Sequence, residues 1–174
     1  MEIRTDRLTL RRARESDLVE VNAFMAHPGA MQYWSTAPHR DLDETRIWLR
    51  AMIDAPAETS DDFLIEFGGR VIGHAGSYPL PDFGFILHPD YWRRGLGYEA
   101  ASAAIHHIFE TRTVAALTAD VDPRNAGSIG LLTKLGFQKT GEARRTYCIA
   151  GEWVDSLYFR LDRPAGIFTA VLGR

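Results

Sequence analysis

Two strand-like runs around a pair of glycines constrain the fold of this chain most strongly. DFLIEF at 62–67 and RVIGHAGSY at 70–78 are rich in β-branched and aromatic residues, which favour extended strands. Gly68 and Gly69 between them can adopt the positive φ angles that a two-residue hairpin turn requires. Because FGFILH at 83–88 can add a third strand, the middle of the chain is predicted to form an antiparallel meander.

The segment before the meander contains a strand and two helices. RLTLRR at 7–12 alternates apolar and polar residues as a half-buried strand does. Ser16 or Asp17 can cap the first helix, and a capping box that starts at Asp41 opens the second. Both helices are therefore predicted to lie between the first strand and the meander.

After the meander, helical and strand-like hydrophobic patterns alternate along the chain. The predicted elements are a helix at 97–111, a strand at 114–121, a helix at 128–135 and strands at 137–144 and 152–161. Antiparallel strands followed by a strand-helix unit are typical of a mixed α+β domain. We therefore expect helices packed around one mostly antiparallel sheet.

Composition limits the class of protein. A chain of 174 residues with 45% hydrophobic residues is long enough for one domain with a sizeable core. The net charge of −3 favours neither a nucleic acid nor an anionic membrane as partner, and no apolar run approaches the length of a membrane span. A charged N-terminus argues against a signal peptide, so we expect a soluble cytoplasmic protein, either monomer or homodimer.

The cysteine count restricts the chemistry further. One cysteine, Cys148, excludes an internal disulfide and a cysteine-rich metal site, and no metal is expected. A lone cysteine in a strand context is more often a packing residue than a nucleophile.

The stretch YWRRGLGYEAA joins the strand at 83–88 to the helix at 97–111. Gly95 and Gly97 lack side chains, so successive N–H groups can converge on an anion at the positive end of the helix. Arg93 and Arg94 add full charges, and a pyrophosphate fits such an arrangement. An ordinary glycine-containing loop with solvated arginines remains the alternative for this motif taken alone.

A dinucleotide fingerprint is a second interpretation of the same glycines. Gly95-x-Gly97-x-x-Ala100 matches its spacing, and Asp120 follows about 20 residues later. In such domains, however, the fingerprint follows the first parallel strand, whereas an antiparallel meander precedes it here. Two arginines also suit a ligand with more phosphate than NAD carries, such as coenzyme A.

Three motifs together resemble one family. FGFILHPDYWRRGLGYEAA resembles the acyl-CoA loop of the GNAT acetyltransferase superfamily, and RTDRLTLRRARESD resembles the opening of the branch that includes the ribosomal-protein N-terminal acetyltransferases. DPRNAGSIGLLTKLGF is similar to the family's Asn-x-x-Ser helix followed by Lys-x-Gly-Phe. The resemblance implies a GNAT domain at 1–163 and a tail at 164–174, in which IFTAVL could be a strand, a partner contact or disorder.

The resemblance also implies which residues contact acetyl-CoA, the expected co-substrate. The backbone of a strand would bind the pantetheine and acetyl carbonyl, loop amides and arginines would bind the pyrophosphate, and one helix would contact the rest. These are Ile86, Leu87 and His88, then Arg93, Arg94, Gly95, Leu96, Gly97 and Tyr98, and finally Asn125, Ser128 and Lys134. Lys134 would reach the 3′-phosphate or belong to a solvated helix face.

Direct attack of an amine on the thioester needs a proton donor and a proton acceptor. Asn125 is a plausible N-cap, which places the Ser128 hydroxyl near the positive end of the helix. The resemblance implies that Ser128 protonates the leaving thiolate; a cap motif that simply begins a core helix is the alternative. Asp82 is the first choice of base, with Glu66, Glu142, His74 and His88 also considered. Two positions depart from the family, because Leu132 replaces a tyrosine acid and Tyr147 replaces a glutamate.

The acceptor site is expected in MQYWSTAPHR at 31–40, where Tyr33 and Trp34 either line a pocket or cover the core. Two functions remain open. The first is an N-acetyltransferase acting on a protein α-amine or a small-molecule amine. The second is a catalytically silent acyl-CoA-binding module, which the two departures would allow.

Overall fold

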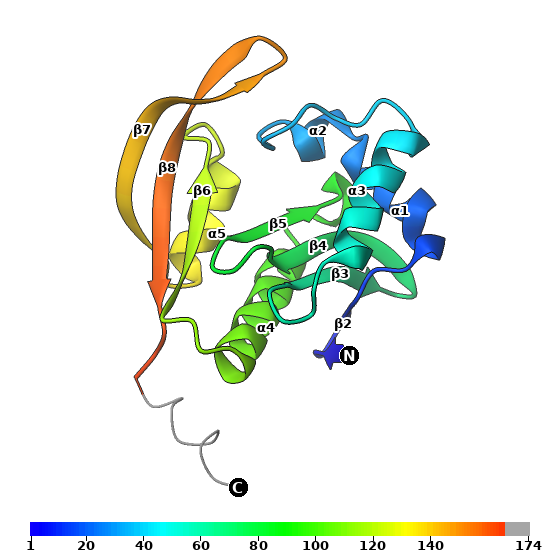
Figure 1. The fold of residues 1–174 in the computed structure, drawn as a ribbon, viewed down its shortest axis with the longest axis horizontal. Coiled ribbons are helices and arrows are strands. Elements are labelled where there is room, and N and C mark those ends of the chain that lie inside the picture. The colour runs from blue at the N-terminus through cyan, green and yellow to red at the C-terminus, as the bar shows by residue number, and fades with distance from the viewer. Residues whose placement is uncertain (166–174) are drawn as a thin grey trace, which may run out of the picture.

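The strands of the protein form two antiparallel sheets. A computed structural model describes residues 1–165, and within them a five-stranded sheet has the order β1-β2-β3-β4-β5 and a three-stranded sheet the order β6-β8-β7 (Figure 1). The first sheet contains β1 (Glu2–Arg4), β2 (Leu8–Arg11), β3 (Asp61–Phe67), β4 (Arg70–Ser77) and β5 (Phe83–Leu87). The second contains β6 (Ala116–Val121), β7 (Gln138–Ile149) and β8 (Glu152–Asp162).

The predicted meander is confirmed. Gly68 and Gly69 have φ angles of 59° and 78° and connect β3 to β4, and β5 pairs antiparallel with β4. The hairpin contains a β-bulge, because the register shifts between Ile65 and Glu66. A bulge changes which face the following side chains point to.

Helices cover both faces of the five-stranded sheet. The bounds are α1 (Leu18–Met25), α2 (Pro28–Met31), α3 (Leu42–Asp54), α4 (Leu96–Thr111) and α5 (Ala126–Lys134), with two short 3-10 helices, η1 (Glu15–Asp17) and η2 (Pro89–Tyr91). One core layer joins Phe24 of α1 and Leu49 of α3 to Leu64 of β3. The other joins Ile105 of α4 to Phe63 of β3 and also includes Leu117 of β6.

Two predicted helix caps follow local side-chain chemistry, whereas Asp17 is the N-cap residue of α1 without a side-chain cap bond. The Asp41 carboxylate accepts hydrogen bonds from the amides of Asp43 and Glu44 at 3.0 and 2.9 Å, which confirms the predicted cap of α3. The Asn125 side chain accepts from the Ser128 amide at 3.0 Å, which confirms the cap of α5. β1 and α2 were not predicted.

One parallel bridge connects the two sheets. The bridge pairs Asp82 with Thr118, and no other ladder between β5 and β6 exists among residues 1–165. The Thr118 amide donates to Pro81 O at 2.9 Å and its hydroxyl to Asp82 Oδ1 at 2.6 Å, while the Ser77 hydroxyl donates to Asp82 O at 2.7 Å. Instead of the one sheet expected from sequence, the strands separate beyond this junction, and β5 keeps an unpaired edge there.

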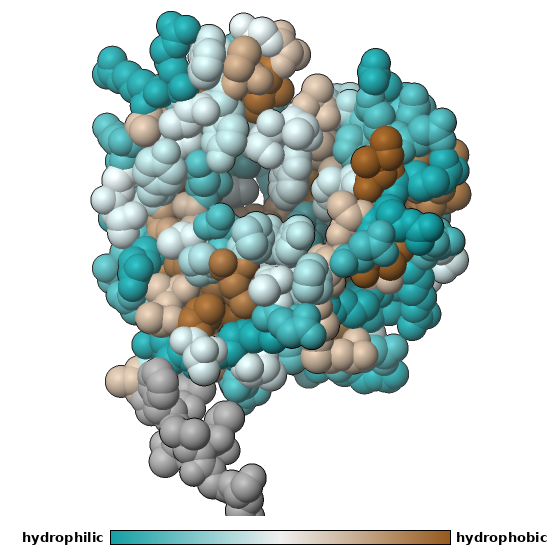
Figure 2. Space-filling model, viewed as in Figure 1, coloured by the Kyte–Doolittle hydropathy of each residue, from teal (hydrophilic) through white to brown (hydrophobic). Residues whose placement is uncertain are grey.

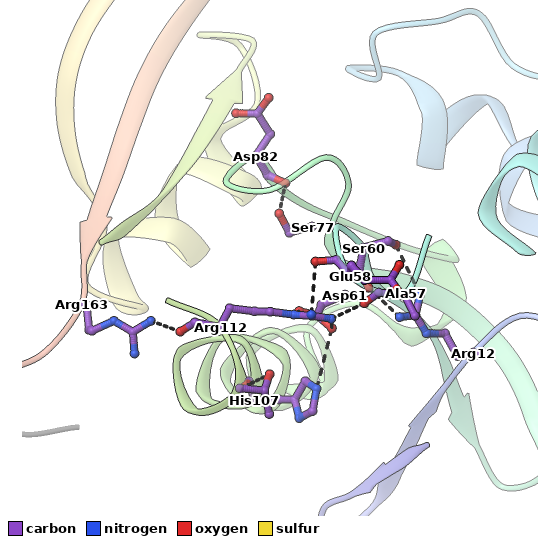
Figure 3. A network of polar contacts seen from close by, with 11 residues as sticks. Arg12, Ala57, Glu58, Ser60, Asp61, Ser77, Asp82, His107, Arg112 and Arg163 are labelled. Carbon is purple, nitrogen blue, oxygen red and sulfur yellow. Dashed lines mark hydrogen bonds and ion pairs between the residues drawn. The ribbon is translucent and has the colours of Figure 1, made fainter. Parts of the chain in front are cut away.

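A buried polar network supports the strands that lead to this junction (Figure 3). Asp61 at the start of β3 is fully buried and binds the Arg112 guanidinium through both carboxylate oxygens, at 2.6 and 2.9 Å. His107 lies 3.8 Å from the same carboxylate. Arg112 also donates to the carbonyls of Ala57 and Glu58, so the loop before β3 is tied to the end of α4.

Two further predictions concern Cys148 on β7 and the C-terminal tail. Cys148 is exposed on β7 opposite Trp153, so its predicted packing role is wrong; this part of β7 lies in the hairpin with β8, away from the helix layers. The predictions for IFTAVL at 167–172 lie outside the described residues. No helix within residues 1–165 is long and apolar enough to cross a membrane.

Candidate active site

The glycine-rich loop forms the N-terminus of α4. Gly95 is the N-cap residue with a φ of +77°, a left-handed conformation that glycine adopts readily. The first amides of a helix have no acceptor within it, and they share the positive end of the helix dipole. In the 16-residue α4 these are the amides of Leu96, Gly97 and Tyr98, an arrangement that favours a negatively charged group.

Aromatic rings hold the Arg94 side chain. Its guanidinium lies 5.0 Å from the centroid of Phe67 and 5.6 Å from that of Tyr91. Arg93, one residue earlier, is exposed and has a φ of 58°. Arg94 is exposed as well, so the two arginines differ in that aromatic rings contact Arg94.

Arg7, which lies outside the glycine motif, holds the loop backbone in place. Arg7 donates from Nη1 to the carbonyl of Arg94 at 2.9 Å and from Nε to the Glu99 carboxylate at 2.7 Å. Glu99 also accepts from the Thr5 hydroxyl at 2.6 Å. Burial alone would raise the pKa of Glu99, but the hydrogen bonds from Thr5 and Arg7 lower it below its usual value, so the carboxylate stays ionised.

The helix α5 brings one further predicted cofactor residue, Lys134, to α4. The Lys134 ammonium lies 4.5 Å from the centroid of the Tyr98 ring, and a Cβ atom on Gly97 would lie 3.5 Å from the Leu131 side chain. Ser128 is the third residue of α5 and is half-buried. The structure therefore brings Lys134 next to the start of α4.

The unpaired edge of β5 presents backbone groups toward β6. The His88 amide donates to Ile72 O at 2.8 Å, within the sheet, and the Leu87 carbonyl accepts from Trp92 Nε1 at 2.8 Å. Hydrogen-bonding groups alternate between the two edges of a strand. The Leu87 amide therefore points away from β4, toward the side where β6 diverges.

A pocket of about 910 Å³ opens on the face between the two sheets. Figure 2 shows this face hollowed between the hairpin of β7 and β8 and the helical side. Its walls come from segment 33–35, α3, β4 and β5 on one side and from β6, β7 and β8 on the other. Tyr33, Trp34 and Asp82 line it, as the sequence suggested, whereas none of the predicted cofactor residues does.

The pocket is acidic and partly aromatic. No lysine or arginine is among its described lining residues, whereas five carboxylates are, namely Asp62, Asp82, Asp120, Asp122 and Asp155. Such a surface raises the local concentration of cations. The Arg124 guanidinium lies 5.9 Å from the centroid of Tyr33 at the border of the pocket and lowers the pKa of Asp122 through hydrogen bonds.

The candidate bases differ in whether they line the pocket. Glu66 forms an ion pair with Arg11 at 2.9 Å, and Glu142 forms one with Lys139 at 2.6 Å; neither lines the pocket. Asp82 does line it. His88, which caps η2 through its side chain, does not.

Tyr147 lies in the pocket on β7. Burial and the neighbouring Asp120 carboxylate raise the pKa of its hydroxyl. The phenol therefore stays protonated at neutral pH and can donate a hydrogen bond.

Sequence reasoning missed several residues that the fold brings to the pocket. Trp48 of α3, Asp62 of β3 and Asp120 of β6 line it. Asp62 carried one usable signal, a carboxylate within a strand whose hairpin partner contains His74. Within residues 1–165, no group of three or more His, Cys, Asp or Glu residues could hold a metal ion.

A family model described as Acetyltransferase (GNAT) domain matches residues 7–138. The chain belongs to this GNAT family. Membership makes it an N-acetyltransferase and agrees with the resemblance of the loop and the Asn-x-x-Ser helix.

The relatives of this GNAT protein are N-acetyltransferases. It is 26% identical over 166 residues to the uncharacterized N-acetyltransferase p20 of Bacillus licheniformis, covering 90% of this chain and 93% of that protein. It is 33% identical over 89 residues to the [ribosomal protein uS5]-alanine N-acetyltransferase of Escherichia coli, covering 51% of this chain and 46% of that one.

Solved structures share the fold. A GNAT acetyltransferase from Bacillus anthracis superposes with a TM-score of 0.81 at 22% identity, covering 94% of this chain and 99% of that one. A spermidine N-acetyltransferase from Vibrio cholerae, in complex with CoA and spermine, superposes with a TM-score of 0.76 at 20% identity, covering 91% and 97%.

Proposed function

We propose that this N-acetyltransferase uses acetyl-CoA and transfers its acetyl group by direct attack to an amine bound in the acidic pocket. The observation that carries the proposal is the position of the pocket. It opens at the junction of β5 and β6, the strands whose separation leaves the edge of β5 unpaired, while the anion-binding loop follows the other end of β5. A donor along β5 would thus meet an acceptor in the pocket.

The donor would bind through backbone groups. The amides from Arg94 to Tyr98 hold the pyrophosphate at the start of α4, with Arg93 adding charge, and Lys134 is placed to reach the 3′-phosphate. Ile86, Leu87 and His88 provide the strand along which the pantetheine lies. The Leu87 amide, which points toward β6, would donate to the thioester carbonyl and stabilise the developing oxyanion. The CoA complex of the Vibrio cholerae neighbour supports this choice of donor.

The acceptor is an amine because the pocket attracts cations, and none of the residues within 1–165 that line it is a lysine or arginine that would repel them. An amine must be neutral to attack. At pH 7 an α-amine loses about 1 kcal/mol to deprotonation, and a lysine-type amine about 4.6 kcal/mol. Relatives that acetylate an alanine α-amine or spermidine support both a protein N-terminus and a small amine as candidates.

The proton steps are assigned to residues of this chain. Ser128, in the first turn of α5, is proposed to protonate the leaving thiolate where the helix dipole favours negative charge. Asp82 is the predicted proton acceptor, and its place in the pocket supports a role in binding the ammonium. Its Oδ1 already accepts a hydrogen bond from the Thr118 hydroxyl at 2.6 Å, which leaves fewer carboxylate lone pairs open to an amine proton.

Release of free thiol tests the function. Acetyl-CoA is incubated with the protein and one acceptor at a time, namely a peptide with a free N-terminal alanine, spermidine, spermine or lysine. Thiol release with at least one acceptor, together with an acetylated product by mass spectrometry, is the expected result. CoA binding without turnover on any acceptor would instead favour the silent binding module that Leu132 and Tyr147 allow.

A further inference from the structure

His74 is a buried histidine in the acceptor pocket. It lies on β4, is 5% exposed, and lines the pocket together with Asp62, Trp34 and Trp48. Its ring centroid is 5.5 Å from that of Trp34 and 5.3 Å from that of Trp48. The imidazole is therefore held between two aromatic side chains.

One ring nitrogen of His74 has a carboxylate partner. Nδ1 lies 3.1 Å from Oδ1 of Asp62. Because an ionised carboxylate can only accept a hydrogen bond, Nδ1 carries the proton and Asp62 holds the ring in one tautomer. In a neutral imidazole of this tautomer, Nε2 bears a lone pair.

The other ring nitrogen has no partner. Nε2 of His74 is the one buried side-chain nitrogen or oxygen among residues 1–165 without a hydrogen bond. Buried polar atoms are nearly always satisfied, because an unsatisfied one has lost its hydration without compensation. A lone pair left in this way within a pocket has the arrangement expected of a group that binds a ligand proton.

The register of the sheet places His74 beside the proposed donor site. His74 pairs with Ile86 of β5, one residue before Leu87, whose amide points toward β6. Paired residues of neighbouring strands point to the same face. The imidazole thus lies on the pocket face next to the strand along which the thioester is proposed to bind.

We propose that His74 is the general base that deprotonates the acceptor amine, with Asp62 as its positioning residue. The proposal rests on the function proposed above and moves the role of base from Asp82 to His74, leaving Asp82 to bind the ammonium. The unpartnered Nε2 lone pair can accept a proton directly, and the Asp62 carboxylate at Nδ1 would stabilise the imidazolium that forms.

The proton balance is complete with acetyl-CoA as co-reactant. The acceptor ammonium gives one proton to Nε2 of His74. The amine nitrogen then forms a C–N bond to the thioester carbonyl carbon, and the C–S bond breaks. The thiolate receives the second amine proton, through Ser128, and the imidazolium of His74 returns its proton to solvent through the open pocket.

The kinetic test uses His74→Gln, since the glutamine amide can still donate to Asp62 but cannot accept a proton at neutral pH. With the best acceptor of the panel above, we expect a loss of about 100-fold in kcat at pH 7. The affinity for CoA, by calorimetry, should stay the same. The loss in kcat should become smaller as the pH rises toward the pKa of the acceptor amine, because more of the amine is then already neutral and needs no base.

The remaining titratable groups that face the same pocket are the five pocket carboxylates and the tyrosines, Tyr33, Tyr78, Tyr147 and Tyr158. Of these, Asp82 is the alternative base. The Asp82→Asn variant is therefore measured over the same pH range as His74→Gln.

Three control variants make the outcome decisive. His106→Gln changes an exposed histidine of α4 that pairs with Glu110, and it should leave every rate unchanged. Asp62→Asn should also lower kcat at pH 7, by a smaller factor than His74→Gln, and this loss should likewise shrink as the pH rises. If His74→Gln does not fold, the pH dependence of Asp62→Asn tests the proposal. An equal loss at every pH, or the described pattern in Asp82→Asn and not in His74→Gln, would overturn the proposal. An inactive wild-type protein would overturn the proposed function instead.

Discussion

The guanidinium of Arg7 donates a hydrogen bond to the backbone carbonyl of Arg94 at 2.9 Å, between residues 87 positions apart in the chain. Arg7 precedes β2, and Arg94 is the residue before the N-cap of α4. The shape of the anion-binding loop thus depends on a side chain outside the loop. Glu99 completes the contact by binding Arg7 from the first turn of α4.

Arg7→Ala should weaken CoA binding without removing any proposed ligand contact. The loop amides would lose the support that holds them in a converging arrangement, and we expect the Kd for CoA to rise about 10-fold, the effect of roughly 1.4 kcal/mol. Calorimetric titration measures the change. Arg4→Ala is the matched control, because the exposed Arg4 bonds Glu2. Equal affinities of the Arg7 and Arg4 variants would contradict the prediction.

Gly97 tests where the pyrophosphate binds. A Cβ on Gly97 would lie 3.5 Å from the Leu131 side chain, an ordinary contact distance, so Gly97→Ala should fold and keep CoA affinity. Alanine in a helix should also add about 0.5–1 kcal/mol of stability. Gly97→Trp should fill the space in front of the amides and abolish CoA binding, while circular dichroism shows an intact fold. Unchanged affinity of the tryptophan variant would refute the placement of the pyrophosphate.

Variants of Asn125 and Ser128 should distinguish a structural role in α5 from a chemical role in catalysis. Asn125→Ala removes the cap of α5 and should cost about 1 kcal/mol of unfolding free energy, which lowers Tm by about 2–4 °C in a protein of this size. Ser128→Ala leaves that cap in place, because Asn125 accepts from the Ser128 amide. It should lower kcat at least 10-fold with little change in Tm; a normal kcat would exclude Ser128 as the acid.

The buried ion pair of Arg11 and Asp17 predicts an acid-sensitive fold. Arg11 donates to both carboxylate oxygens of Asp17, at 2.8 and 2.9 Å. Burial would raise the pKa of Asp17, but hydrogen bonds from Arg11 and the Arg14 amide lower it below 3.8, its ordinary value. A lowered folded-state pKa gives stability that is complete above the unfolded-state pKa and lost as the pH falls through the folded one.

Chemical unfolding between pH 2 and pH 7 measures this effect. The wild-type protein should lose stability as the pH falls below about 4, the ordinary pKa range of an aspartate. Asp17→Asn should start less stable at pH 7, because Arg11 loses its partner, and should lose less on acidification. Parallel curves for the two proteins would show that Asp17 does not contribute to the acid sensitivity.

Most elements of the fold could be predicted because each has a local cause. The glycine pair defines the turn of the β3–β4 hairpin, Asp41 and Asn125 cap their helices, and the hydrophobic period distinguishes α4 from the strands. β1 and α2, with 3 and 4 residues, are too short for any period to show. The division into two sheets escaped prediction, because strand pairing across the β5–β6 junction depends on contacts distant in sequence.

The glycine-rich start of α4 could likewise be predicted, since it needs only adjacent glycines before a helical period. That its amides bind a cofactor stays a prediction. The acceptor pocket could not be predicted. Its walls come from strands and helices that are far apart in the chain, and the sequence suggested Tyr33, Trp34 and Asp82 but missed Trp48, Asp62 and Asp120.

His74 shows the physical reason why the residues of the pocket could not be predicted. Strict alternation from Val71, which packs against the α1 and α3 layer, would point residue 74 toward α4. The bulge between Ile65 and Glu66 shifts the register by one residue and pairs His74 with Leu64, on the same face as Asp62. The sequence by itself determined the hairpin and the caps of α3 and α5, because these depend on neighbouring residues. Only the tertiary structure decided which face His74 occupies and which side chains meet it there, because one extra residue in a strand reverses the direction of every side chain that follows.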